Sequence, residues 1–193
     1  MTADQDPVGR ELAGSGWTPT HADHPNRDLD PGLRAWQSPD RRLLLFASSP
    51  RSAGHLIGLV APHAPGQTEK PLWQINGGPV PAPVAAAMAR AAATAPERAD
   101  DLAAAGWSRD PDSELSFAIA GLTAWTGPAP SDGDRSWSAV LFPMPTAALS
   151  LWTVKGAHGG QDCTLMATAD TPAHVIAAAV SAAPRPADAV EGP

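Results

Sequence analysis

Arginine and tryptophan side chains in the first half of the chain form the most suggestive chemical pattern in the sequence. Arg34, Arg41 and Arg42 lie on both sides of a Ser-Pro-Asp segment, Trp36 lies between them, and Trp73 follows further along. Guanidinium groups bind phosphates, and tryptophan rings stack on bases with about 1 to 3 kcal/mol per base. These five residues are therefore the candidates for binding a nucleic acid or another partner. The alternative, which we favour, is that the tryptophans anchor the core and the arginines protect a solvated sheet edge from aggregation.

The residues that could hold a metal or act as nucleophiles do not form a complete set. His21 and His24 place two imidazoles beside one carboxylate, whereas a zinc site needs three or four ligands, and no second pair stands at that spacing. Cys163 lies on a predicted strand, where we expect a small buried side chain. A nucleophile pair with His158 or His174 is the alternative reading of this cysteine. We predict no metal, no cofactor and no catalytic residue.

Serine and glycine motifs likewise point to no reaction. Ser48 and its neighbours lie near His55 but lack the strand, elbow and helix order that a serine nucleophile requires. The pairs Gly77-Gly78 and Gly159-Gly160 precede no Lys-Ser or Lys-Thr, so we interpret them as turns and not as phosphate-binding loops. The sequence therefore predicts a protein that is not an enzyme.

The sequence segments that carry these residues occur twice in the chain. Three motifs recur in the same order at an offset of about 90 residues: Glu11–Trp17 and Asp101–Trp107, Gly32–Trp36 and Gly121–Trp125, Pro81–Val84 and Pro172–Val175. A fixed period indicates internal repetition, and this period is too long for a solenoid and suits a small domain. We infer a duplicated domain. Because the tryptophans at positions 17, 36, 107 and 125 repeat with it, their role is predicted to be structural.

Each copy shows four strand signals followed by a helix. The strands are predicted at 33–37, 42–47, 55–61 and 71–75, and again at 115–125, 137–142, 148–154 and 162–168, with helices over 84–95 and from 171 onward. We predict an α+β fold of two tandem ββββα units, each an antiparallel four-stranded sheet plus helix, packed as an intrachain pseudo-dimer. The predicted boundaries are a disordered segment at 1–10, repeats at 11–95 and 96–184, and a disordered tail at 185–193. The second repeat is expected to open with a short helix at about 97–105.

These motifs give the chain a family resemblance. With Ala35–Asp40, Pro71–Trp73, Leu102–Trp107 and Thr171-Pro172, residues 11–183 resemble an actinobacterial family known as domain of unknown function 317, whose members frequently carry two copies. The second copy lacks the Ser-Pro-Asp turn and has Met166 where the first has Trp73. The resemblance implies a fold and no catalytic or binding residues. A tandem ββββα body is also similar in shape to single-stranded nucleic-acid binders of the Pur-alpha and Whirly type.

The charge balance limits the partners. The net charge is −7, and residues 96–193 carry all the acidic excess, with 5 Lys/Arg against 12 Asp/Glu, whereas residues 1–95 carry 8 of each. This balance disfavours long-range attraction to nucleic acid or an anionic membrane. One cysteine, no signal peptide and no apolar window of about 18 to 20 residues predict a cytoplasmic protein without a membrane span.

We therefore expect a non-enzymatic binding module whose partner is another protein or a second copy of the chain, as a homodimer. Its alanine-rich helices, with small side chains that allow close helix packing, suit such an interface. The alternative hypothesis is single-stranded nucleic-acid binding through the first sheet. The acidic loop at 127–134, longer than the corresponding turn of the first copy, is either a functional arm or a tether.

Overall fold

The computed structural model describes residues 6–20, 32–48, 55–61, 71–94, 102–111, 121–128, 137–143, 150–158 and 161–182. The first half forms α1 (Pro7–Leu12), β1 (Thr18–Thr20), β2 (Arg34–Gln37), β3 (Leu44–Ala47), β4 (His55–Ala61), β5 (Trp73–Val80) and α2 (Ala82–Ala93). The second half forms η2 (Leu102–Ala105), β6 (Ser108–Asp110), β7 (Thr123–Thr126), β8 (Ser138–Phe142), β9 (Leu151–His158), β10 (Gln161–Thr168) and α4 (Ala173–Ser181). The fold is α+β, as predicted.

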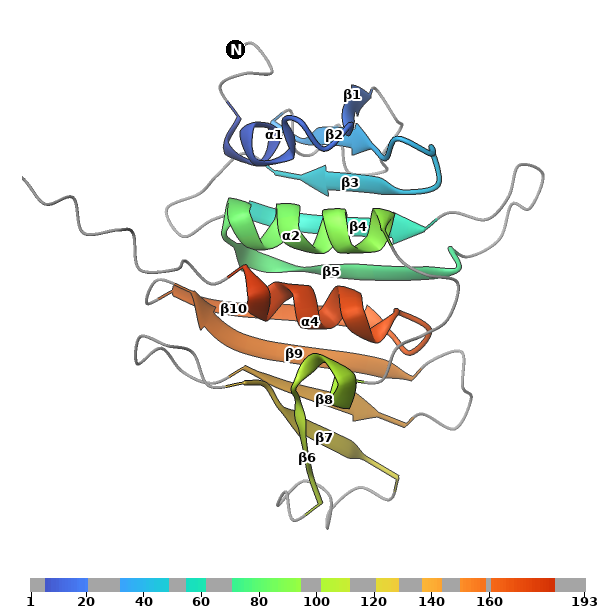
Figure 1. Cartoon of the computed structure of the whole chain (residues 1–193), viewed down its shortest axis with the longest axis vertical. Helices are drawn as coiled ribbons and strands as arrows, with labels where there is room; N and C mark the ends of the chain where they lie inside the picture. Colours follow the sequence, from blue (N-terminus) through green and yellow to red (C-terminus); the bar gives the residue numbers. More distant parts are fainter. Residues whose placement is uncertain are drawn as a thin grey trace, which may run out of the picture.

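All ten of these strands belong to one antiparallel sheet. Its order is β1-β2-β3-β4-β5-β10-β9-β8-β7-β6, so the last strand of each half meets the other at the centre (Figure 1). The central pairing is antiparallel, with Met166 opposite Asn76. The two predicted sheets are therefore joined edge to edge as one sheet.

The prediction of four strands per unit was incomplete, because each half adds a fifth. β1 and β6 are three residues long and form the two outer edges, each following a Gly-Trp pair. A segment this short has no room for the alternation that marks a strand in the sequence. The predicted strand ends also shift, since β5 continues to Val80 rather than stopping at Ile75.

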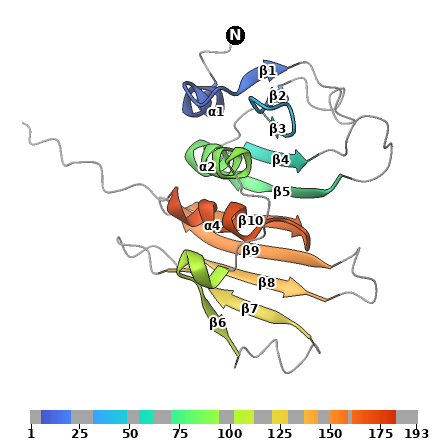
Figure 2. The same ribbon diagram turned by 45° about the vertical axis from the view of Figure 1, so that its right-hand side comes forward.

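The helices gather on one face of the sheet, and both views show them on the same side (Figures 1 and 2). α2 and α4 lie side by side above the central strands, with α1 beside α2 and η2 beside α4. Among the described residues, no helix lies on the opposite face, which we call the open face. The sheet is thus a layer with one covered side.

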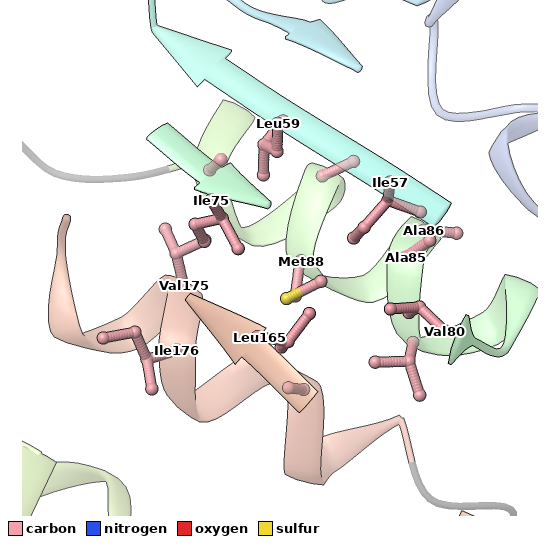
Figure 3. Close-up of a cluster of buried hydrophobic side chains, with 14 of the residues drawn as sticks. Ile57, Leu59, Ile75, Val80, Ala85, Ala86, Met88, Leu165, Val175 and Ile176 are labelled. Carbon is pink, nitrogen blue, oxygen red and sulfur yellow. The ribbon is translucent and has the colours of Figure 1, made fainter. Parts of the chain in front are cut away.

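The core fills the space between the two long helices and the sheet. Figure 3 shows apolar side chains of α2 and α4 meeting those of β4, β5 and β10: Ile57, Leu59, Ile75, Val80, Ala85, Ala86, Met88, Leu165, Val175 and Ile176. Full burial of each large member stabilises the fold by about 1.5 to 3 kcal/mol. The small alanines let the helices approach each other and the sheet closely. The alanine-rich faces that suggested a dimer between chains are therefore used within this one.

The start of α1 is fixed by a side-chain cap. The carboxylate of Asp6 accepts a hydrogen bond of 3.0 Å from the backbone N–H of Val8, which caps α1, and Pro7 stands in its first turn. α1 therefore begins inside the segment 1–10 that we expected to be disordered, because an N-cap and Val8 and Leu12 in the core fix it. Residues 1–5 and 185–193 lie outside the described residues.

Glycines mark two kinds of position. Gly16 and Gly106 adopt positive φ angles of 78° and 82° after α1 and η2, as a left-handed helix end requires. Gly77 and Gly78, which we interpreted as a turn, lie inside β5. A Cβ at Gly77 would lie 2.8 Å from Cα of Leu165 and overlap the carbonyl oxygen of Thr164. Glycine is therefore needed there for the close approach of β10.

No helix in the described part of the chain is long and apolar enough to cross a membrane.

Candidate functional site

Most of the tryptophan side chains pack in or against the hydrophobic core. Trp17, Trp36 and Trp107 are only 7, 4 and 3 % exposed, and Trp125 is partly buried against the same cluster, so the structural role predicted for the repeated rings is confirmed. Trp137 is likewise buried, at 1 % exposed. The rings pack on the helix-covered side, where Trp36 pairs in register with buried Leu45 and Trp73 with Ala61. These indoles therefore offer little ring surface for stacking on bases.

The arginines do not form one patch. Arg34 is exposed at the start of β2, whereas Arg41 and Arg42 are exposed in the turn that follows the other end of that strand. The structure thus places Arg41 and Arg42 together and separates Arg34 from them by the length of the strand.

The turn that carries these two arginines is a closed hydrogen-bonded unit. The hydroxyl of Ser38 donates to Oδ1 of Asp40 at 2.6 Å and accepts the backbone N–H of Leu43 at 2.9 Å. The hydrogen bond from Ser38 is the main cause that lowers the pKa of Asp40, aided by the backbone N–H and the charge of Arg42. Arg41 takes a left-handed φ of 61° to complete the turn. The local chemistry holds the hairpin together and leaves the guanidinium groups at the surface.

Ser48 directly follows β3 and His55 begins β4, and the contact between them is structural. Nδ1 of the His55 ring lies 2.7 Å from the carbonyl oxygen of Ser48, and the Ser48 hydroxyl accepts the backbone N–H of Leu56 at 2.9 Å. Both side chains are buried. They satisfy backbone groups at a strand end rather than forming a nucleophile and base.

Cys163 is a buried residue of β10, as predicted. It is 1 % exposed, and burial raises the pKa of its thiol to about 12. A thiol in this environment stays protonated and unreactive at neutral pH. The motif around His21 and His24 lies outside the described residues, and the residues that are described contain no group of three metal-binding side chains.

The open face is a broad surface of the sheet to which none of these residues gives a role (Figure 2). One row of side chains crosses all ten strands in register, one residue from each: Thr20, Ala35, Phe46, Gly58, Asn76, Met166, Thr153, Val140, Ala124 and Asp110. Their neighbours along each strand, such as Leu45 and Leu165, belong to the core. Because side chains alternate between the two sides of a strand, this row lies on the open face.

The open face has more apolar side chains than a solvated sheet normally carries. Met166, at the centre of the row, is 53 % exposed, and Leu151, which pairs with Thr168 on the neighbouring strand β9, is 40 % exposed. Leu44, Val60 and Phe142 lie on the same face and are partly buried. Phe46, also on this face, is buried but does not belong to the main core cluster. In an antiparallel sheet with one solvent-exposed face, apolar and polar residues usually alternate along each strand. Here exposed apolar side chains stand among neutral polar ones in the middle of the open face.

On the described part of this face, no charged side chain lies opposite Met166 or directly along β10 from it on the same side, and Lys155 is the nearest charged residue. Lys155 is two residues along β9 from Thr153, a distance of about 7 Å, and Asp162 is four residues from Met166 on β10, about 13 Å. Asp110 ends the row at the edge strand β6. The middle of the open face combines methyl and methylene groups with neutral Asn, Gln and Thr side chains.

Our reasoning from the sequence did not select this face, although a signal was present. Leu43–Ala47 is an uninterrupted apolar run, which is typical of a strand covered on both sides.

The comparisons with known proteins add no relative: no protein-family model, no curated protein and no solved structure matches the chain.

Proposed function

We propose that this chain is a non-enzymatic protein-interaction module and that the open face of its sheet is the binding surface. The observation that carries this proposal is the exposed, uncharged centre of the face, with Met166 about half exposed between neutral neighbours. Protein interfaces have such centres, since charged residues are depleted there and methionine is enriched. Methionine is also flexible enough to fit an irregular partner surface.

The remaining surfaces of the sheet are less suited to binding. The edge strand β1 contains Pro19, β6 is three residues long, and proline and shortness both prevent edge-to-edge pairing. The covered face is occupied by α1, α2, α4 and η2 (Figure 2). The open face is therefore the broad surface on which a partner can pack.

The duplicated architecture belongs to the same proposal. We infer that the chain is two related units packed as an intrachain pseudo-dimer, each a ββββα unit extended by a short edge strand. The mirrored strand order and the three repeated motifs support this inference, and the resemblance to the domain of unknown function 317 family remains part of it. A cytoplasmic location is likewise proposed, on the single cysteine and its burial.

Single-stranded nucleic-acid binding receives less support. Trp36 is 4 % exposed and Trp73 packs against the core, so neither presents an open ring. Arg34 stands apart from Arg41 and Arg42. With a net charge of −7, backbone attraction alone would have to supply the affinity.

The test is site-specific photo-crosslinking in cells. A benzophenone amino acid replaces Met166 on the open face, and in a matched control it replaces Ala103, which is exposed in η2 on the helix side. We expect one defined protein adduct from position 166 and none from position 103. No protein adduct, or equal adducts from both positions, would refute the proposal.

A second arm addresses nucleic acid. A mixed-sequence single-stranded oligonucleotide is added to the purified chain at low and at moderate salt, with light scattering and tryptophan fluorescence as readouts. We expect no change in mass. A salt-sensitive complex that weakens when Arg41 and Arg42 are both changed to Ala would favour the nucleic-acid hypothesis instead.

A further inference from the structure

We propose that the occupant of the open face is a second copy of this chain, packed face to face so that two ten-stranded sheets form a sandwich. This inference rests on the proposed function and names its partner. The interface would centre on Asn76 and Met166, the pair at which the two halves of the sheet meet.

The extent of the face fits what a stable dimer needs. Ten strands about 4.8 Å apart span roughly 43 Å, and their mean length corresponds to about 18 Å, so the whole face, with the already buried Phe46 and Ala124 included, has a projected area of roughly 800 Å² per copy. A standard protein interface buries about 800 Å² on each partner. Twisted sheets pack in this way at a spacing of about 10 Å, with their inner side chains interdigitating.

The charge distribution favours a like partner. Two copies of a chain with net charge −7 repel each other over most of their surfaces and can approach only through a patch without charge. In a two-fold interface, each residue near the axis meets its own counterpart, so a charged centre would repel itself. The centre of the open face holds Asn76, Met166 and Thr153, which can meet copies of themselves without this penalty. A basic partner would instead require acidic residues there.

The side chains suit a self-complementary contact. Met166 is 53 % exposed and can fill gaps against its counterpart, and the exposed amide of Asn76 can both donate and accept a hydrogen bond. Apolar positions lie on both sides of this pair in the sheet, with Val60 toward β4 and Leu151 and Val140 toward β9 and β8. The open face therefore has apolar side chains on both sides of the Asn76–Met166 pair, as a two-fold interface centred there requires.

Light scattering and sedimentation of the full chain test this inference. The wild-type chain is expected at twice its mass of 19.8 kDa. Met166→Glu and Met166→Lys each place like charges across the axis and should weaken the dimer at least about a hundredfold. Mixing the two variants should restore a dimer with one copy of each. Ala103→Glu, a charge added on the helix side, is the matched control and should leave the wild-type mass unchanged.

Each outcome decides between the alternatives. A strictly monomeric wild-type chain at high concentration overturns the inference, as does a dimer that both charge variants retain. Circular dichroism and thermal unfolding of every variant separate lost assembly from lost folding, because Met166 is solvent-exposed in the single chain. A monomer whose position 166 still crosslinks to a different polypeptide overturns only the self-association. A monomer with no protein adduct at position 166 overturns the proposed function as well.

Discussion

Gly156 offers the sharpest test of the packing, since an alanine there would collide with a buried ring. It lies in β9 on the covered side, and a Cβ would sit on the indole of Trp137, 2.5 Å from Cγ and Cε2 and closer still to Cδ2. Real Cβ atoms essentially never come within 3.0 Å of another heavy atom. We therefore predict that Gly156→Ala displaces the Trp137 ring or shifts the strand beneath it.

The expected loss of stability follows from how firmly that ring is held. Trp137 is 1 % exposed, and its carbonyl oxygen accepts a backbone hydrogen bond of 2.7 Å from Gly127. A Cβ at Gly127 would already lie 3.1 Å from Cβ of Trp137, so that side is also tight. Overpacking costs about 1 to 3 kcal/mol, and a ring without room to move places Gly156→Ala near about 3 kcal/mol.

Urea unfolding followed by circular dichroism measures this loss, and Gly58→Ala is the matched control. Gly58 lies in β4, the strand of the first half that corresponds to β9, and its Cβ would meet the side-chain oxygen of exposed Asn76 at 3.1 Å. Because that side chain can move, the control should change stability by no more than about 0.5 kcal/mol. With a slope of about 2 kcal/mol per molar urea, Gly156→Ala should lower the midpoint by about 1.5 M.

A double variant separates the collision from other effects of alanine. When Trp137→Phe has already reduced the ring, adding Gly156→Ala should cost at least about 1 kcal/mol less than it does in the wild type. Equal midpoints for Gly156→Ala and Gly58→Ala, or strictly additive effects in the double variant, would refute the packing argument.

Three further predictions concern the hairpin turn and the cysteine. Ser38→Ala removes the acceptor for the buried N–H of Leu43 and should lower the free energy of unfolding by about 1 to 3 kcal/mol in urea titrations, whereas an unchanged midpoint would contradict the hydrogen bond. Asp40 has a lowered pKa in the folded state, so its charge stabilises the turn at pH above its ordinary value of 3.8, and this stabilisation is lost as the pH falls through the lowered pKa. Wild type should therefore be slightly more stable than Asp40→Asn at about pH 6 and equal to it at about pH 2, and a constant difference would assign the effect to something other than the charge. Cys163, with a pKa raised to about 12, should resist iodoacetamide in the folded protein at about pH 8 and react within minutes in urea, and rapid labelling of the folded chain would contradict its burial.

The local elements of this protein can be predicted from its sequence. Apolar runs, alternation and turn residues predicted segments that overlap eight of the ten strands, and proline and glycine marked the ends of the helices. The repeated motifs predicted that Trp17, Trp36 and Trp107 are buried anchors, and all three are. These features follow from short-range chemistry, because side-chain alternation, helix capping and positive φ angles involve residues close together in the chain.

The way in which the two halves meet, and the surface that this leaves open, follow from contacts between distant parts of the chain. β5 and β10 pair through backbone groups that every sequence possesses, so no side-chain pattern predicts that pairing. The need for glycine at position 77 is seen only in the folded chain, where Leu165 lies against it. The sequence likewise offered Arg34, Arg41, Arg42, Trp36 and Trp73 as a candidate surface, whereas the fold buries the indole of Trp36 and separates the arginines. The exposed centre at Met166 gathers residues from strands distant in the chain. Such a surface exists only after all ten strands are in register.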